Sequence, residues 1–462
     1  MKIKNLMITG LAALALTGCK SLYGTYERPQ VNTKGLIRDV ASAADTLAVT
    51  DTTSFGCLPW HSVFTDPQLQ GLIEHGLANN KDLLNAALNV KMVEAQLNMA
   101  KLAFIPSFTF SPSGTISSWD GNKVNKTYQL PIAASWTVDL FGNLLSVKRN
   151  AQISLLATKD YQLVVKTKII SGVANMYYTL LMLDRQMEIV TEMEGLTKDT
   201  WDLMKLQKEL GHVRSPGVQS AEANYYSVQA QKADLKRQIR ETENSLSLLI
   251  GQPVQTIARG KLDVQSLPAN FSTGVGIRML DNRPDVHYAE MSLASCFYNI
   301  ETARSHFYPS LTITPTAAFT NSAGGAVVNP GKWLASAVGS LVQPIFMHGQ
   351  LVAGLKVAKL QYEQAYNTWQ NAILSAGSEV SNALVLYSSS EEKSQLENKQ
   401  ITTLKQNVAD TKLLLKQSNS TYLEVITAQQ TLLNAELSKV ADDFYKMQAV
   451  VSLYEALGGG VK

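Results

Sequence analysis

The sequence repeats itself in two stretches, each at its own constant offset, and this repeat limits the chain to a fold built from two similar halves. The segment "AKLAFIPSFTFSP" (Ala100–Pro112) matches "ARSHFYPSLTITP" (Ala303–Pro315). Later matches keep one offset without a gap, beginning with Gly142 and Gly349. An insertion in a packed helix would rotate every later side chain off its face. The unbroken register therefore predicts two internal repeats whose helical hairpins have equal lengths.

Two stretches without proline, Leu144–Leu210 and Leu351–Gln417, predict very long helices. At about 1.5 Å per residue, each helix would extend roughly 100 Å. A break follows each stretch, at 211–217 and at 418–422, and a second helix then completes a hairpin. The apolar stripes of these helices are narrow, and their other faces are polar. This pattern fits an ordinary coiled coil and also the wall of a water-filled tube.

Four segments have the composition and length of β-strands that cross a bilayer, which takes roughly 9–11 residues. Four strands cannot close a barrel, and open sheet edges are not tolerated in lipid. If these strands span a membrane, several chains must share one barrel, and three chains would give about twelve strands. The predicted strands are 107–117, 128–139, 310–320 and 333–345.

The N-terminus predicts a secreted and lipid-anchored protein. Two lysines precede an apolar stretch that ends in small residues, which indicates a signal peptide over residues 1–18. The residues Leu16–Cys19 are similar to the bacterial lipobox, so Cys19 is the predicted site of lipidation. No later apolar run reaches the roughly 18 residues that a transmembrane helix requires. A membrane-crossing part of the mature chain would therefore consist of strands.

The composition gives no sign of nucleic-acid binding or of catalysis. Basic and acidic residues nearly balance, at 41 and 38, so the composition does not indicate a basic surface for nucleic-acid binding. The six histidines lack metal-site spacing, and no glycine loop precedes a helix to hold phosphate. We expect no catalytic site, no cofactor and no metal site, and we predict that the chain is not an enzyme. The spacing of Cys57 and Cys296 leaves open whether they form a disulfide.

Three segments together resemble the TolC-type outer membrane efflux proteins: "NRPDV" (Asn282–Val286), "WTVDLFGNL" (Trp136–Leu144) and "ALGGG" (Ala456–Gly460). Within that family, the chain is most similar to the lipoproteins that serve resistance-nodulation-division pumps. The resemblance implies a mixed α+β membrane protein in which three protomers form one channel. Each protomer would give four strands to an outer-membrane β-barrel of about twelve strands. Long helical hairpins would continue this barrel as a periplasmic α-barrel.

The resemblance also implies a function, partners and a domain order. The chain would be the passive exit duct of a tripartite efflux pump that exports small molecules, a lipid-anchored homotrimer in the cell outer membrane. Its partners would be outer-membrane lipid, a periplasmic adaptor and an inner-membrane resistance-nodulation-division transporter, with no nucleic acid. The implied segments are a lipid-anchored N-terminal segment (19–65), a first repeat (66–251), an equatorial linker (252–280) and a second repeat (281–462).

The family places a gate and an adaptor contact near the hairpin breaks. Family members often have an acidic residue immediately before an Ala-Gln pair, but this chain has Thr427 there. Glu424 lies one helical turn earlier and is the natural substitute, with Asp410 as a second gate candidate. A ring of carboxylates would attract cations, whereas the alternative for each residue is a solvated helix face. Candidate contacts at the tip are His212, Arg214 and Ser418, the last at a position where glycine is common in the family.

Three alternatives remain at this point. A channel of a type I protein secretion system is the alternative within the family. A periplasmic coiled-coil scaffold lipoprotein would have the hairpins but would not need four strands of bilayer length. A specific nutrient porin would consist of strands throughout, instead of being dominated by helix.

Overall fold

The computed structural model describes residues 24–31, 36, 55–118, 120–121, 124–265, 283–323, 326–417 and 421–461. The signal peptide, Cys19, Ser418 and residues 266–280 of the predicted linker lie outside the described residues. The contacts divide the chain into a strand-bearing unit (Met1–Val31, Leu88–Lys159 and Tyr288–Asn371) and a helical unit (Asn32–Ala87, Asp160–His287 and Ala372–Lys462). In the described ranges, no helix has both the length and the apolar character that a membrane crossing requires.

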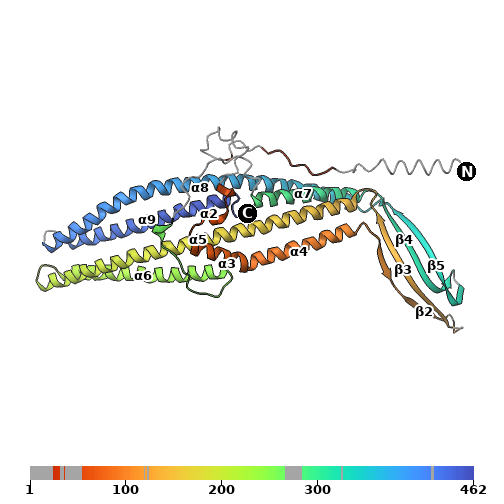
Figure 1. Cartoon of the computed structure of the whole chain (residues 1–462), viewed down its shortest axis with the longest axis horizontal. Coiled ribbons are helices and arrows are strands. Elements are labelled where there is room, and N and C mark those ends of the chain that lie inside the picture. The colour runs from red at the N-terminus through yellow and green to blue at the C-terminus, as the bar shows by residue number, and fades with distance from the viewer. Residues whose placement is uncertain are drawn as a thin grey trace. The chain divides into compact units, whose positions relative to one another are not determined.

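The long helices occur in pairs of identical length (Figure 1). The pair α4 and α7 has 22 residues each, α5 and α8 have 67 each, and α6 and α9 have 35 each. This equality confirms the two internal repeats. The bounds are Lys81–Leu102 (α4), Pro284–Ser305 (α7), Asn143–Glu209 (α5), Gln350–Lys416 (α8), Ser215–Leu249 (α6) and Tyr422–Ala456 (α9). Shorter helices are η2 (Phe55–Cys57), α2 (Trp60–Val63), α3 (Pro67–Asn79) and η3 (Leu262–Val264).

One capping interaction occurs in both repeats although its residues differ. The last carbonyls of a helix lack partners within the helix. In the first repeat, Asn80 Nδ2 donates a hydrogen bond to the carbonyl of Leu249 at the end of α6, over 2.8 Å. In the second repeat, Arg283 Nη1 donates to the carbonyl of Ala456 at the end of α9, over 2.9 Å. Asn80 and Arg283 directly precede α4 and α7. Each thus supplies a hydrogen-bond donor to a carbonyl at the end of the last long helix of its repeat.

The strands form one antiparallel sheet in the strand-bearing unit, with the order β1-β3-β4-β5 and with β2 also paired to β3. Its central pair joins the two repeats, since Trp136 of β3 lies opposite Ile313 of β4. Figure 1 shows the sheet at the ends of the helices that lead into it and out of it. The strands are β1 (Ser107–Phe110), β2 (Ser113–Ser117), β3 (Asn125–Val138), β4 (Ser310–Ala323) and β5 (Ala326–Val342).

The strand bounds differ from the predicted ones in several ways. The predicted strand 107–117 is two strands, because the chain breaks at Ser111 and Pro112, and proline cannot donate a ladder hydrogen bond. The β4 and β5 strands extend into residues 321–332, which lie between the two predicted strands, and Ala323 still pairs with Ala326. The same strand β5 ends at Val342 and not at 345, since Pro344 follows.

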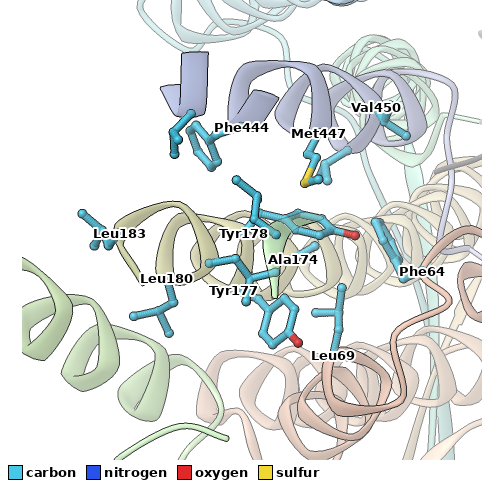
Figure 2. Close-up of a cluster of buried hydrophobic side chains, with 14 of the residues drawn as sticks. Phe64, Leu69, Ala174, Tyr177, Tyr178, Leu180, Leu183, Phe444, Met447 and Val450 are labelled. Atoms are coloured by element: carbon cyan, nitrogen blue, oxygen red, sulfur yellow. The ribbon is translucent and has the colours of Figure 1, made fainter. Parts of the chain in front are cut away.

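The core of the helical unit forms where α5, α9 and the N-terminal helices meet. Figure 2 shows Tyr178 of α5 directed toward Met447 of α9, and Tyr177 directed toward Leu69 of α3. Both tyrosines are buried, at 2% and 0% exposure. Phe64 completes this layer with its ring 5.8 Å from that of Tyr454. The N-terminal helices are therefore part of the core and not a peripheral tail.

Polar contacts attach the described part of the linker to this core. Asp66 Oδ2 accepts hydrogen bonds from the Tyr177 hydroxyl over 2.5 Å and from Gln265 Nε2 over 2.8 Å. The same hydroxyl accepts from the backbone N–H of Gly260 over 2.9 Å. Next to it, the Arg259 guanidinium binds Asp184 and Glu243, with nitrogen–oxygen distances of 2.5 and 2.6 Å. These bonds fix the linker against α5 and α6.

Asp66→Asn is expected to destabilise the protein at neutral pH but not in acid. Burial raises the pKa of Asp66, but hydrogen bonds from Tyr177, Gln265 and the backbone of Gln68 outweigh it and hold this pKa below its ordinary value. A lowered folded-state pKa stabilises the protein above the unfolded pKa of about 4, and this contribution disappears as pH falls through the folded value. We expect a loss of about 1–2 kcal/mol at pH 7.

Thermal unfolding of the detergent-solubilised protein at pH 7 and at pH 3 would measure this difference. Asp82→Asn, which neutralises an exposed carboxylate at the start of α4, is the matched control and should change stability by less than about 0.5 kcal/mol. If Asp66→Asn lowers the stability by the same amount at both pH values, the expectation is contradicted.

Candidate functional site at the hairpin turns

An apolar cluster joins both hairpins near their turns. Gly217, at the start of α6, permits this close approach, because a Cβ there would lie 2.9 Å from Met204 and 3.3 Å from the Tyr422 ring of the other hairpin. The cluster therefore holds the start of α9 against the first hairpin. Its buried members are Met204, Ala221, Leu415, Val425 and Ile426, with Trp201, Leu203, Val213, Val218 and Tyr422 packed around them.

Side-chain amides provide most of the polar contacts between the two hairpins. Gln207 Nε2 donates to the carbonyl of Leu415 over 3.0 Å. Farther from the turns, Gln430 Nε2 donates to Asn224 Oδ1 over 3.1 Å. One ion pair also crosses between the hairpins, from Lys412 to Asp199 over 3.1 Å. The contact between the hairpins thus combines apolar packing with hydrogen bonds, both near the turns and farther along the helices.

The gate candidates all have exposed side chains. Glu424 and Thr427 lie one turn apart on the exposed side of α9, opposite the buried Val425 and Ala428. Asp410 lies on α8, where it accepts a hydrogen bond from Gln406 Nε2 over 2.9 Å. The structure therefore brings Glu424 and Thr427 onto one face and leaves Asp410 on the other limb of the hairpin.

The candidate tip contacts lie in the turn between α5 and α6. His212 and Arg214 are exposed there. The backbone N–H of His212 donates to the carbonyl of Gln207 over 2.9 Å, which closes the end of α5 after Gly211, whose φ is +80°. Arg214 is the residue immediately before α6. Ser418 is not among the described residues.

An aromatic patch near the first turn was missed in the sequence. Trp201 stacks on Tyr225 with ring centroids 5.6 Å apart, and Tyr226 next to it is 52% exposed. The ammonium of Lys205 lies 3.9 Å from the centre of the Trp201 ring. The signal that could have found this patch is helical spacing, since Trp201 and Lys205 are one turn apart and the two tyrosines are adjacent.

The family model for "Outer membrane efflux protein" matches residues 72–252 and 277–459. The chain belongs to the outer membrane efflux protein family. Cation efflux system protein CusC of Escherichia coli is 27% identical to this efflux protein over 97% of the chain and 98% of CusC. Probable outer membrane lipoprotein SilC of Salmonella typhimurium is 26% identical over 99% of both chains. The open state of the Neisseria gonorrhoeae MtrE outer membrane channel superposes with a TM-score of 0.80, at 26% identity over 96% of this chain and 99% of that chain.

Membership in this family confirms the mixed α+β fold class, the outer-membrane location and a role in efflux. The family consists of transport proteins. In the residues that the structure describes, no group of three or more histidine, cysteine or carboxylate side chains is arranged to hold a metal ion. Cys57 and Cys296 are both described, and neither takes part in a disulfide there.

Proposed function

We propose that this efflux protein works as a homotrimer and forms the exit duct of a tripartite pump. The observation that carries the proposal is a sheet with two edges, formed by β1 and β2 on one side and by β5 on the other. The strands are also covered with exposed apolar side chains, such as Phe108, Ile116 and Trp333, each 74% exposed. Sheet edges are not tolerated in lipid, so neighbouring copies must pair them and close the barrel.

Helix α4 carries a second surface that fits another copy of the chain. Residues Leu88, Met92, Ala95, Met99 and Leu102 follow one another at alternating steps of four and three residues, and all of them are exposed. This spacing is typical of a coiled-coil seam. Because α4 leads into β1 and α8 follows β5, pairing of β1 with β5 of the next copy would place the seam beside that copy's α8. The exposed side chains of Val357 and Leu360 on α8 supply an apolar face for it.

The remaining parts of the pump follow from the relatives and the exposed turns. CusC is named as part of a cation efflux system and SilC as a lipoprotein, which favours pump-linked export and a lipid anchor at Cys19. A periplasmic adaptor would bind the hairpin turns, where His212, Arg214 and Ser418 are the candidate contacts, and the exposed Tyr226 lies on α6, which begins after the first turn. Exposed aromatic side chains such as that of Tyr226 are frequent anchors of protein interfaces. An inner-membrane resistance-nodulation-division transporter would supply the energy.

Electron microscopy of the mature, detergent-extracted protein tests the proposal directly. We expect a threefold particle with one tunnel that extends from the detergent belt into a helical tube. The helix rise gives roughly 100 Å for the length of this tube. Monomeric particles, or particles without a detergent belt, would contradict the shared barrel.

Glu424→Gln is expected to reduce the cation selectivity of the channel. In a trimer, three copies of Glu424 on the exposed face of α9 would form a ring of negative charge around the axis. Removal of three charges should lower the cation-to-anion permeability ratio roughly threefold or more. The reversal potential in a KCl gradient across a planar bilayer measures this ratio. Glu392→Gln removes an exposed charge from α8 farther from the hairpin turn and is the matched control, and equal effects of the two variants would argue against a gate at Glu424.

A further inference from the structure

A polar cavity lies between the two hairpins, on the side of the apolar cluster away from the turns. Its volume is about 160 Å³, and residues of α5, α6 and α9 line it. The rim consists of exposed side chains, so the cavity is open to solvent. The rim residues are Ser227, Gln231, Gln430 and Asn434, and the buried floor consists of Met193, Thr197, Asn224, Val228, Gln429 and Leu433.

Gln429 is fully buried, at 0% exposure, although it carries an amide. Its Nε2 donates to the Thr200 hydroxyl over 2.9 Å and to the carbonyl of Leu196 over 3.3 Å. A backbone carbonyl can only accept a hydrogen bond, so the contact with Leu196 fixes which end of the amide faces α5. The other end, Oε1, has no hydrogen-bond partner among the described residues. A buried amide oxygen without a partner is destabilising and calls for a donor.

We infer that the cavity is a hydration site in which ordered water donates a hydrogen bond to Gln429 Oε1. A water molecule needs roughly 10–15 Å³ of such space and two to four polar partners. The cavity has room for several water molecules. Thr197, Asn224, Ser227 and Asn434 provide hydroxyl and carboxamide groups that can bind the remaining donors and acceptors of this water. The chemistry of the ligand is that of a small neutral molecule that both donates and accepts.

The hydration site adds to the proposed function, and its role in the opening of the duct rests on that function. Where the hairpins meet through water and amides, hydrogen bonds can exchange with solvent at little cost. Where they meet through Met204, Val425 and Leu415, separation would expose apolar surface. The hydrogen bonds of Gln429 can therefore be exchanged for bonds to the cavity water when the duct opens, whereas separation of Met193, Val228 and Leu433 would expose apolar surface there as well. The presence of water itself does not depend on transport.

Methionine oxidation by dilute hydrogen peroxide tests the site, because peroxide is close to water in size and polarity. Peroxide transfers one oxygen to the thioether, which becomes the sulfoxide, and leaves as water. Met193 lines the cavity and is 2% exposed, whereas Met204 lies in the apolar cluster and is 0% exposed. We expect sulfoxide at Met193 to form at least tenfold faster than at Met204, as read by peptide mass spectrometry of the full-length protein. Equal, slow rates would overturn the inference.

A variant separates this cavity from a second route to the same methionine. Met193 also borders a more apolar cavity of about 300 Å³ between α5, α8 and α9. Ser227→Leu places a large side chain at the rim of the polar cavity alone and is expected to slow Met193 oxidation severalfold. Ser220→Leu, an exposed substitution on α6 outside the cavity, should leave the rate unchanged. If Met193 oxidises equally fast in both variants, peroxide enters elsewhere and the hydration site at Gln429 is wrong.

Discussion

Met92→Asp is expected to break the homotrimer into monomers that keep their helices. Met92 is 57% exposed in the protomer and occupies the middle of the α4 seam. In the trimer its side chain would be buried against α8 of the next copy, and a buried carboxylate without a partner costs at least about 2 kcal/mol. Three seams are affected at once. The association constant of the trimer should therefore fall by more than about a thousandfold, since about 1.4 kcal/mol corresponds to a factor of ten.

Mass photometry or native electrophoresis of the detergent-solubilised protein measures the fraction of trimer, and far-ultraviolet circular dichroism checks that the monomer remains folded. Asn98→Asp is the matched control, because it adds the same charge to an exposed position of α4 that borders the seam without entering it. Trimers of normal stability in Met92→Asp would show that α4 does not contact another copy.

Arg259→Ala is expected to lower the free energy of unfolding by about 3–5 kcal/mol, because it leaves a buried charge without a partner. The side chain of Glu243 is only 5% exposed, and Arg259 Nη1 lies 2.6 Å from its Oε1. Arg259 also holds Asp184, with Nη2 2.9 Å from Oδ1. Loss of the guanidinium would release the described linker from α5 and α6 as well as unpair Glu243.

Urea unfolding of the solubilised protein, followed by circular dichroism, measures the change. Arg185→Ala is the control, since Arg185 is 40% exposed in its pair with Glu188 and should contribute less than about 1 kcal/mol. The double variant Arg259→Met with Glu243→Leu replaces the buried pair with apolar side chains and should recover most of the lost stability. If Arg259→Ala lowers the free energy of unfolding no more than Arg185→Ala does, the buried pair is not what holds the linker.

The long helices could be predicted from the sequence because their signals are local and cumulative. The absence of proline over 67 residues of α5, and the unbroken offset between Gly142 and Gly349, leave few alternatives to paired helices. The ends of the strands could not be predicted as well. Pairing of Ser322 with Val327 depends on the partner strand, and their Ser, Ala, Gly and Asn neighbours are typical of loops.

The contacts between the hairpins could not be predicted because they join residues that are far apart in sequence. Gln429 belongs to a polar-looking stretch, and only the structure shows it fully buried with its amide against Thr200. Arg259 is similar, since nothing near it in the sequence indicates Asp184 as its partner. The gate candidates differ from these residues. Glu424 and Thr427 are exposed in one protomer, so their role depends on neighbouring copies.

Because the helices of the two repeats have identical lengths, the two hairpins can change length only together. Both outward helices have 67 residues and both return helices have 35, so a deletion in one hairpin alone would move its turn away from the apolar cluster that it shares with the other. A shorter duct would require matched deletions in the outward and return helices of both repeats. Removal of about 18 residues from each, or roughly five full turns and 27 Å, would keep every remaining side chain on its face. The distance that such a protein spans in the periplasm can therefore change only through matched deletions or insertions in both repeats.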